Sequence, residues 1–440
     1  MTDGEFESDR STGEFRAAHD PYSTLRIPEY RRYLLAMLAA GIGAEMRDLA
    51  IGWELYERTG SFLALGAVGL ALIIPVLLLA LPAGHLSDSL SRVRVILAGE
   101  ILITVSAVVL ACVSYFSGPI IIYYGCLILI GIAGAISRPA RWAVVPQLVP
   151  NSLVSNAVTW SSTGWQVAAI AGPALAGRLI ESTGTACWVY LCEAACAIAA
   201  IVSLAGLETP PARVEREPLT WASMAAGFSF VARSRLILAT LTLDLFAVLL
   251  GGAVTLLPVY SRDILRLTPA GLGWLRAATP LGAFVMSLIL NQRRPMTQPG
   301  RSLLYAVAGF GMATIVFGLS TDPMLSFAML FLIGAFDNIS VVVRATIVQV
   351  LTPDTMRGRV SAVNGIFIGA SNELGGFESG LVARLFGPVV AVVSGGVGSI
   401  LVVLGVAWIW PEVARLGSLT KLGAADAERS VEGTGVDSVG

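Results

Sequence analysis

The stretch Leu81–Leu97, LPAGHLSDSLSRVRVIL, joins two apolar runs of the sequence through one short polar turn. The first run ends at Gly84, the turn carries Asp88, and Arg92 and Arg94 come just before the second run. Glycine lets two backbones approach closely, and arginines in a short loop hold that loop on the cytoplasmic side of a membrane. The stretch therefore predicts two membrane helices joined by a tight cytoplasmic turn. Any short loop that follows the positive-inside rule would fit the same pattern.

The composition of the whole chain favours a polytopic membrane protein. Of its 440 residues, 55% are hydrophobic and 13% are charged, whereas soluble proteins have roughly 25% charged residues. Apolar windows of about 20 residues, long enough to cross a bilayer, recur along the sequence. The net charge of −1 gives no reason to expect a nucleic-acid partner. The two histidines offer no metal site, and the sequence has no ATPase-type phosphate-binding loop, so we expect no metal, no cofactor and no enzyme activity.

The apolar windows predict an all-α membrane protein with twelve transmembrane helices in two six-helix bundles, 29–207 and 234–411. The expected helices are 33–55, 62–84, 93–115, 119–138, 153–180, 185–207, 234–260, 270–291, 302–320, 323–348, 361–386 and 388–411. Prolines and alternating charges mark 208–233 as a cytoplasmic linker, with an amphipathic helix expected at Leu219–Val231. The polar ends, 1–28 and 412–440, are expected to be disordered cytoplasmic tails.

An offset of 203 residues relates the two predicted bundles. It pairs Arg141 with Arg344 (344 − 141), Gly131 with Gly334, Pro150 with Pro353, Gly172 with Gly375 and Gly177 with Gly380. Five concordant positions indicate an internal repeat, so the bundles are expected to be pseudo-symmetric. Arginine bias orients them with both termini in the cytoplasm. On the opposite side we expect only Arg58, Arg178, Arg262, Arg266 and Arg384.

The turn at 84–93 resembles the signature of the major facilitator superfamily, the loop G-x-L-x-D-R-x-G-R-[RK] between its second and third helices. The matching residues are Gly84, Leu86, Asp88 and Arg92, and the sequence departs from the signature at Ser89, Ser91 and Val93. Within the superfamily the chain is similar to the branch of enterobactin exporters and drug-efflux proteins. That likeness rests on Ala50–Trp53, Tyr56–Ser61, Arg138–Arg141, Val149–Pro150, Gly172–Pro173 and Gly358–Ser361.

The resemblance implies alternating access, in which two bundles rock about a central site. A proton or ion gradient, or the gradient of the substrate itself, would drive the motion. It also implies a cytoplasmic gate, in which Asp88 would face the start of the eleventh helix near Ser361. There Asp88 would pair with Arg92, Arg138 or Arg141, because a carboxylate is favoured at a helix N-terminus.

The first predicted helix carries the most unusual charges. Glu45 and Asp48 share one face of it, whereas Arg47, Glu54 and Arg58 share a roughly opposite face. A bare charge inside a bilayer costs at least ~2.5–3.5 kcal/mol, so such residues are functional candidates. We expect Glu45 or Asp48 to carry a proton or to bind a cationic group of the substrate, and Glu54 to be a structural partner of the arginines. Alternatively, Arg47 pairs with Asp48 or Glu45 in a structural cluster.

Later helices add weaker candidates. Asp244, Asp337 and Glu373 are expected to be further charges of the central cavity. Arg344 and Glu378 are expected to be structural charges. Because Asp337 and Arg344 share a stripe on the tenth helix, a simpler alternative is an ion pair within that helix.

The sequence thus predicts a monomeric secondary transporter of the inner or plasma membrane. It would export a small hydrophobic or amphipathic molecule, of drug or siderophore type, in exchange for protons. An uptake symporter or a lysophospholipid flippase of the same fold stays open, because sequence does not settle the direction of transport. A non-transporting receptor or scaffold is the alternative of another class.

Overall fold

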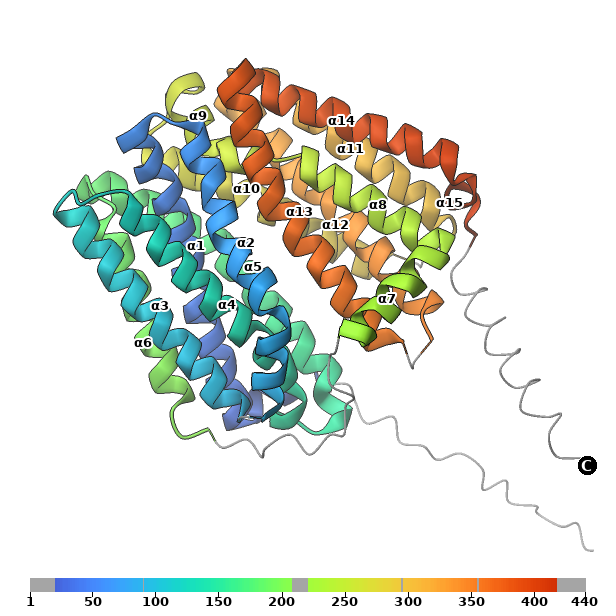
Figure 1. The fold of residues 1–440 in the computed structure, drawn as a ribbon, viewed down its shortest axis with the longest axis horizontal. Helices are drawn as coiled ribbons and strands as arrows, with labels where there is room; N and C mark the ends of the chain where they lie inside the picture. Colours follow the sequence, from blue (N-terminus) through green and yellow to red (C-terminus); the bar gives the residue numbers. More distant parts are fainter. Residues whose placement is uncertain (1–19, 90, 208–220, 294–295, 354–355, 418–440) are drawn as a thin grey trace, which may run out of the picture.

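The chain is built of helices throughout the part that the structure describes (Figure 1). The structure, a computed structural model, describes residues 20–89, 91–207, 221–293, 296–353 and 356–417, and of residues 80–89 and 221–224 it describes the backbone alone. No strand occurs in these ranges. The prediction of an all-α protein is confirmed.

The helices follow one another with short connections. The first half of the chain contains α1 Pro28–Thr59, α2 Phe62–Ser89, α3 Arg92–Tyr115, α4 Ile121–Leu148, α5 Val154–Thr183 and α6 Cys187–Leu204. The second half contains α7 Trp221–Arg233, α8 Arg235–Leu250, α9 Leu257–Val259, α10 Pro269–Gln292, α11 Pro299–Leu319, α12 Pro323–Leu351, α13 Arg357–Phe386, α14 Pro388–Ile409 and α15 Pro411–Arg415. Short turns of 3₁₀ or π type are η1 Ser23–Arg26, η2 Asn151–Leu153, η3 Ala253–Leu256 and η4 Tyr260–Ile264.

Nine segments are long and apolar enough to cross a membrane, counted over the described residues. They are α2, α3, α4, α6, α10, α11, α12, α14 and the segment Arg235–Ile264. The helices α1, α5 and α13 are not among them, although each is 30 residues or longer. All three carry polar or charged residues along their length, which lowers their hydropathy. Two of these less apolar helices, α1 and α13, hold most of the predicted cavity charges.

Two helices differ clearly from the predicted ranges. The fourth continues ten residues beyond the expected end, to Leu148, although it contains Pro139 and Pro146; neighbouring helices make such prolines tolerable in membrane helices. The seventh breaks after Leu250, where the prediction continued to 260. The break occurs where Gly252 lies against α13, so close that a Cβ there would be 2.8 Å from the carbonyl oxygen of Gly375.

The predicted tails are ordered where they join the helices. Residues 20–27, expected to be disordered, include η1, in which Thr24 is fully buried and hydrogen-bonded to Asn156 of α5. The indole Nε1 of Trp160 also donates to the carbonyl of Pro21 at 2.9 Å. At the other end α15 is ordered, and its Val413 is fully buried. Residues 1–19, 208–220 and 418–440 lie outside the described residues.

Equivalent helix crossings recur at the repeat offset. The glycine pairs concerned are Gly131 and Gly334, Gly172 and Gly375, and Gly177 and Gly380. A Cβ on Gly172 would lie 2.6 Å from the Cβ of Glu45 on α1, and a Cβ on Gly375 would lie 3.0 Å from the carbonyl oxygen of Val248 on α8. Glu45 and Val248 are themselves 203 positions apart (248 − 45). The contact of α5 with α1 is thus repeated by the contact of α13 with α8.

The third glycine pair joins the two halves of the chain. Gly177 of α5 lies against Pro269 and Gly273 of α10, and Gly380 of α13 lies against Gly66 of α2. Pro269 and Gly66 are again 203 positions apart (269 − 66). In Figure 1 α2 and α13 run side by side between the other helices of the two halves. Both contacts use the first residues of α2 or α10 and the second half of α13 or α5, so the halves are held together at one end.

Candidate functional site

Arg47 on α1 binds two acids in the interior of the first six helices. Its Nη1 donates to Oε1 of Glu193 on α6 at 2.6 Å, and its Nη2 donates to Oδ1 of Asp48 at 2.8 Å. Arg47 is 6% exposed and Glu193 is 1% exposed. The arginine reaches α6 because the helices are close here: a Cβ on Gly43 would lie 3.3 Å from the Cα of Glu193. The alternative in which Arg47 pairs with Asp48 is the one observed, and the sequence had pointed to no pair with Glu193.

Glu45, one turn before Asp48, has a different environment. It lies at the crossing of α1 with α5, against Gly172. Within the described part of the chain it has no ion-pair partner within 4 Å. The charges that act on it are those of Arg276 on α10, Asp48 and Arg47. Glu45 is thus an acid of α1 without a bound base among the described residues, and a charge from the second half of the chain, that of Arg276, acts on it.

Glu373 on α13 is a second acid without a bound base among the described residues. It lies against α2, where a Cβ on Gly69 would be 3.1 Å from its Oε2. The charges of Asp48, Arg138 and Arg276 act on it. Three helices from both halves of the chain therefore bring Glu45, Glu373 and Arg276 into one electrostatic environment.

Arg276 is the residue that sequence reasoning missed. It is the eighth of the 24 residues of the apolar helix α10, one turn after Gly273, which packs against α5. An arginine inside an apolar window is a functional signal in itself, because of the cost of its charge in a bilayer. The pattern of acids in the first helix could not show that the charge of Arg276, on another helix, acts on Glu45.

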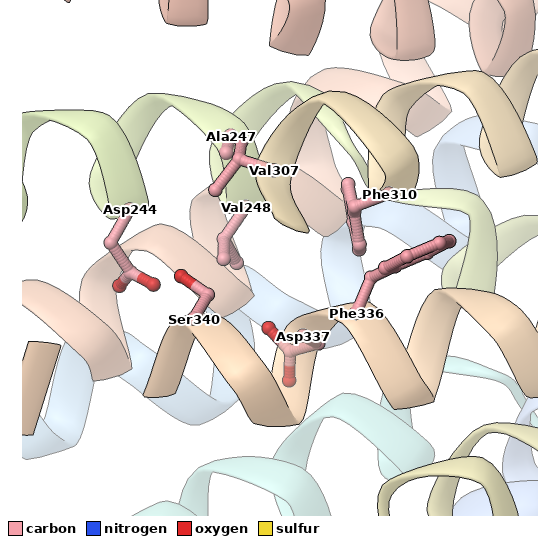
Figure 2. A pocket seen from close by; sticks show the side chains of 8 residues that line it. All are labelled: Asp244, Ala247, Val248, Val307, Phe310, Phe336, Asp337 and Ser340. Atoms are coloured by element: carbon pink, nitrogen blue, oxygen red, sulfur yellow. The ribbon is translucent and has the colours of Figure 1, made fainter. Parts of the chain in front are cut away.

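A second charge cluster lies between α8 and α12. Asp244 of α8 and Arg344 of α12 form an ion pair, and the two residues are 7% and 5% exposed. Figure 2 shows Asp244 beside Ser340, with Asp337 one turn away on the same helix as Ser340. They line a cavity of about 10 Å³, room for about one water. The alternative of an ion pair between Asp337 and Arg344 is not what the structure shows, because Arg344 is bound by Asp244.

The remaining acids on the predicted list have nearby partners of their own. Arg58 lies 3.7 Å from Glu54 one turn earlier on α1, and the hydroxyl of Tyr190 on α6 donates to Glu54 at 3.1 Å. This is the structural surrounding that was expected for Glu54. Glu378 on α13 accepts a hydrogen bond of 3.4 Å from the hydroxyl of Ser379 and has no ion pair with a described residue.

The structure describes the side chains of only some residues of the predicted cytoplasmic gate. Gly84 and Asp88 belong to α2, but their side chains lie outside what the structure describes. Nη2 of Arg141 donates to Oε1 of the buried Glu100 on α3 at 2.5 Å, so Arg141 has an acid other than Asp88. Arg92 donates to the carbonyl of Ala143. Arg138 is exposed, and its charge acts on Glu373.

Comparison with known proteins identifies the family. The profile described as transmembrane secretion effector, a family of major facilitator transporters, matches residues 19–420. The chain belongs to this family. The resemblance to the exporter branch of the major facilitator superfamily is thereby confirmed. A relative in the family's exporter branch is the enterobactin exporter EntS of Escherichia coli O1:K1, 28% identical over 286 residues. That match covers 63% of this chain and 65% of the exporter, a little under two thirds of its length.

Solved structures agree with the family at the level of the fold. The nucleoside transporter NupG superposes with a TM-score of 0.68 over 87% of this chain and 99% of its own, at 12% identity. A bacterial homologue of the human lysosomal transporter Spinster, in an inward-facing and occupied conformation, has a TM-score of 0.64 over 90% of this chain and 97% of its own, at 14% identity. These similar proteins are transporters and not enzymes, as predicted.

Proposed function

We propose that the chain is a secondary active transporter that exports a small amphipathic molecule in exchange for protons. Its twelve long helices would cross the inner membrane as two six-helix bundles, 29–207 and 234–411, with both termini in the cytoplasm. The repeated crossings at an offset of 203 support the two bundles. The arginine bias of the loops supports the orientation. In this orientation the end where α2 meets α13 and α5 meets α10 is the outer end, so the proposed conformation faces inward.

The observation that carries the proposal is that the charge of one arginine, Arg276, acts on both Glu45 and Glu373. Each is an acid without a bound base among the described residues, and the charge of Arg276 acts on both. Glu45 belongs to the first bundle, whereas Glu373 and Arg276 belong to the second. A carboxylate without a bound base is costly away from water. A proton on either acid removes that cost.

Coupling follows if the bundles move apart around this site. Rocking would change the distance from Glu45 to Arg276 and Glu373, and with it the cost of keeping Glu45 ionised. Proton occupancy and conformation would then depend on one another, as linkage requires. Asp48 has a fixed partner in Arg47, so we assign it a positioning role and assign proton exchange to Glu45 and Glu373.

The relative suggests where to look for the substrate. EntS is described as an enterobactin exporter, so a siderophore is the first candidate for this chain and a cationic drug is the second. A lysophospholipid tests the flippase alternative. Uptake in place of export would use the same acids, and the direction is found by measuring transport in vesicles of known orientation.

The decisive experiment measures proton release when each of the three ligands is added to purified protein in detergent. Wild type is compared with Glu45→Gln, Glu373→Gln and Asp48→Asn, with ligand binding followed in parallel. We expect one ligand to release protons from wild type and from Asp48→Asn, and to bind Glu45→Gln or Glu373→Gln without release. The control is Glu181→Gln, which changes an exposed acid paired with Arg178. Binding without release in wild type would contradict proton coupling and favour a uniporter.

A further inference from the structure

A large groove lies away from the charge cluster, over α12 and between α10 and α11. Both neighbours pack along α12 but have little contact with one another. The groove has a volume of about 1220 Å³, above the roughly 300–1,000 Å³ of sites for drug-sized ligands. Its walls are mainly aliphatic side chains. One end lies at Phe336, near the middle of α12, and the other lies at Val350, near the end of α12.

The two ends of the groove differ in polarity. The end near Val350, where α10 ends and α11 begins, is lined by the polar residues Asn291, Arg293 and Ser302. Arg293 is exposed, and within the described residues it has no ion-pair partner. Tyr305, 74% exposed, lies one turn further along α11; tyrosine favours the interface between headgroups and hydrocarbon. The groove is therefore basic at one end and apolar along the rest.

The length of the groove matches one leaflet. Phe336 and Val350 are 14 residues apart on a continuous helix (350 − 336), about 21 Å at 1.5 Å per residue. One leaflet contributes roughly half of the ~30 Å hydrocarbon core, and the headgroup region adds several more ångströms. A basic pocket between membrane helices on the cytoplasmic side is a recognised way to hold an anionic lipid headgroup.

We propose that this groove binds a phospholipid of the cytoplasmic leaflet with an anionic headgroup. The phosphate lies beside Arg293, with the side-chain amide of Asn291 as a hydrogen-bond donor, and the acyl chains lie along α12 towards Phe336. The lipid is a bound component of the transporter and not its cargo. The inference rests on the orientation proposed above, in which the end with Arg293 is cytoplasmic, and it does not depend on proton coupling.

The test measures binding of phosphatidylglycerol and of phosphatidylcholine with the same palmitoyl and oleoyl chains. Each lipid is titrated onto delipidated full-length protein in detergent, and native mass spectrometry gives the dissociation constant of the first bound lipid. We expect wild type to prefer phosphatidylglycerol about fivefold, the ratio that corresponds to the ~1 kcal/mol of one arginine near an anionic headgroup. Arg293→Gln should abolish the preference, and Arg301→Gln, which changes an arginine outside the groove, should keep it.

A second pair of variants tests the apolar part. Val342 lines the groove and is 39% exposed, whereas its neighbour Val341 is 38% exposed and does not line it. Val342→Trp should weaken binding of both lipids several-fold, and Val341→Trp should leave both unchanged. Equal binding of the two lipids by wild type, an unchanged preference in Arg293→Gln, or equal effects of the two tryptophans would overturn the proposal. Transport measured on the same variants separates this outcome from a failure of the proposed function.

Discussion

At the scale of single residues, Arg47 illustrates how a membrane interior holds ionised groups. Its guanidinium donates to Asp48 beside it and to Glu193 on another helix. Arginine suits this role, because its fork of donors can serve two carboxylates at once. The Oε2 atom of Glu193 has no hydrogen-bond partner among the described residues. Among the described residues, Arg47 is therefore the one base that pairs with the charge of Glu193.

Replacing Arg47 should strongly destabilise the protein. Arg47→Met leaves Glu193 buried without a base, which typically costs about 3–5 kcal/mol. We expect a clearly lower Tm by thermal unfolding in detergent, and recovery of most of the loss when Glu193→Gln is added. Arg178→Met removes an exposed ion pair and should change stability by less than about 1 kcal/mol. A Tm for Arg47→Met equal to that of the control would contradict the buried pair.

Arg276 should matter for coupling more than for folding. Arg276→Gln removes the base whose charge acts on Glu45 and Glu373, so both acids should stay protonated through the cycle. Substrate should still bind, but an imposed proton gradient should no longer drive its transport in proteoliposomes. Arg276→Lys should retain part of the coupled transport. Arg384→Gln, at an exposed arginine of α13, serves as the control; full coupled transport by Arg276→Gln would exclude this role.

At the scale of helices, glycines decide which faces meet. Gly172 lets α5 approach α1 at Glu45, and Gly375 lets α13 approach α8. Small residues at such crossings allow the backbone contact on which helix association in membranes depends. The crossing at Gly172 is also the one that positions Glu45, so packing and the proposed site are linked there.

Adding one methyl group should destabilise the protein at a close helix crossing and stabilise it at an open helix position. Gly172→Ala would place a Cβ 2.6 Å from that of Glu45, an overpacking that typically costs about 1–3 kcal/mol. Gly125→Ala, on α4 where no described residue of another helix lies within 4 Å of a Cβ, should gain about 0.5–1 kcal/mol because alanine is the better helix former. Thermal unfolding of the two variants should therefore shift in opposite directions. Stabilisation by Gly172→Ala would contradict the close crossing.

At the scale of the whole molecule, the two halves are joined at one end. Gly66 and Gly177 lie in the contacts of that end, whereas no described residue of another helix lies within 4 Å of a Cβ on Gly358 or Gly365 in the first part of α13. A transporter that alternates between two faces must open the joined end and close the other.

Distances between spin labels can detect this exchange. One pair is Ser155→Cys with Gly358→Cys, at the starts of α5 and α13, and the other is Ser182→Cys with Thr268→Cys, at the joined end. The five native cysteines are first replaced by alanine. Double electron–electron resonance spectroscopy should then show that the distance between the labels of each pair changes on acidification or on addition of substrate. We expect one distance to shorten as the other lengthens. Parallel changes at the two ends, or none, would contradict rocking of the halves.

Much of this protein could be predicted from the sequence, because bilayer physics acts on local patterns. Apolar windows mark helices, since each backbone group in lipid must be bonded within its own segment. The offset of 203 predicted the repeat, and the equivalent crossings of Gly172 and Gly375 agree with it. The family followed from the turn after Gly84 and from short motifs. The break in the seventh helix and the ordered residues 20–27 were not predicted, because both depend on contacts with distant helices.

The partners of the charges were decided by the tertiary structure alone. Helical periodicity shows which residues of one helix share a face, but not which helix that face meets. Arg47 pairs with Glu193, 146 positions away, and Arg344 pairs with Asp244 rather than with Asp337 on its own helix. For the same reason, the sequence did not show that Arg276 acts on acids of other helices. The sequence by itself determined a helical, internally repeated membrane protein of the major facilitator superfamily with acids in its first helix. Packing of α1 on α5 and α6, and of α5 on α10, decided which acids have a bound base, because the cost of an uncompensated charge depends on what lies across the helix interface.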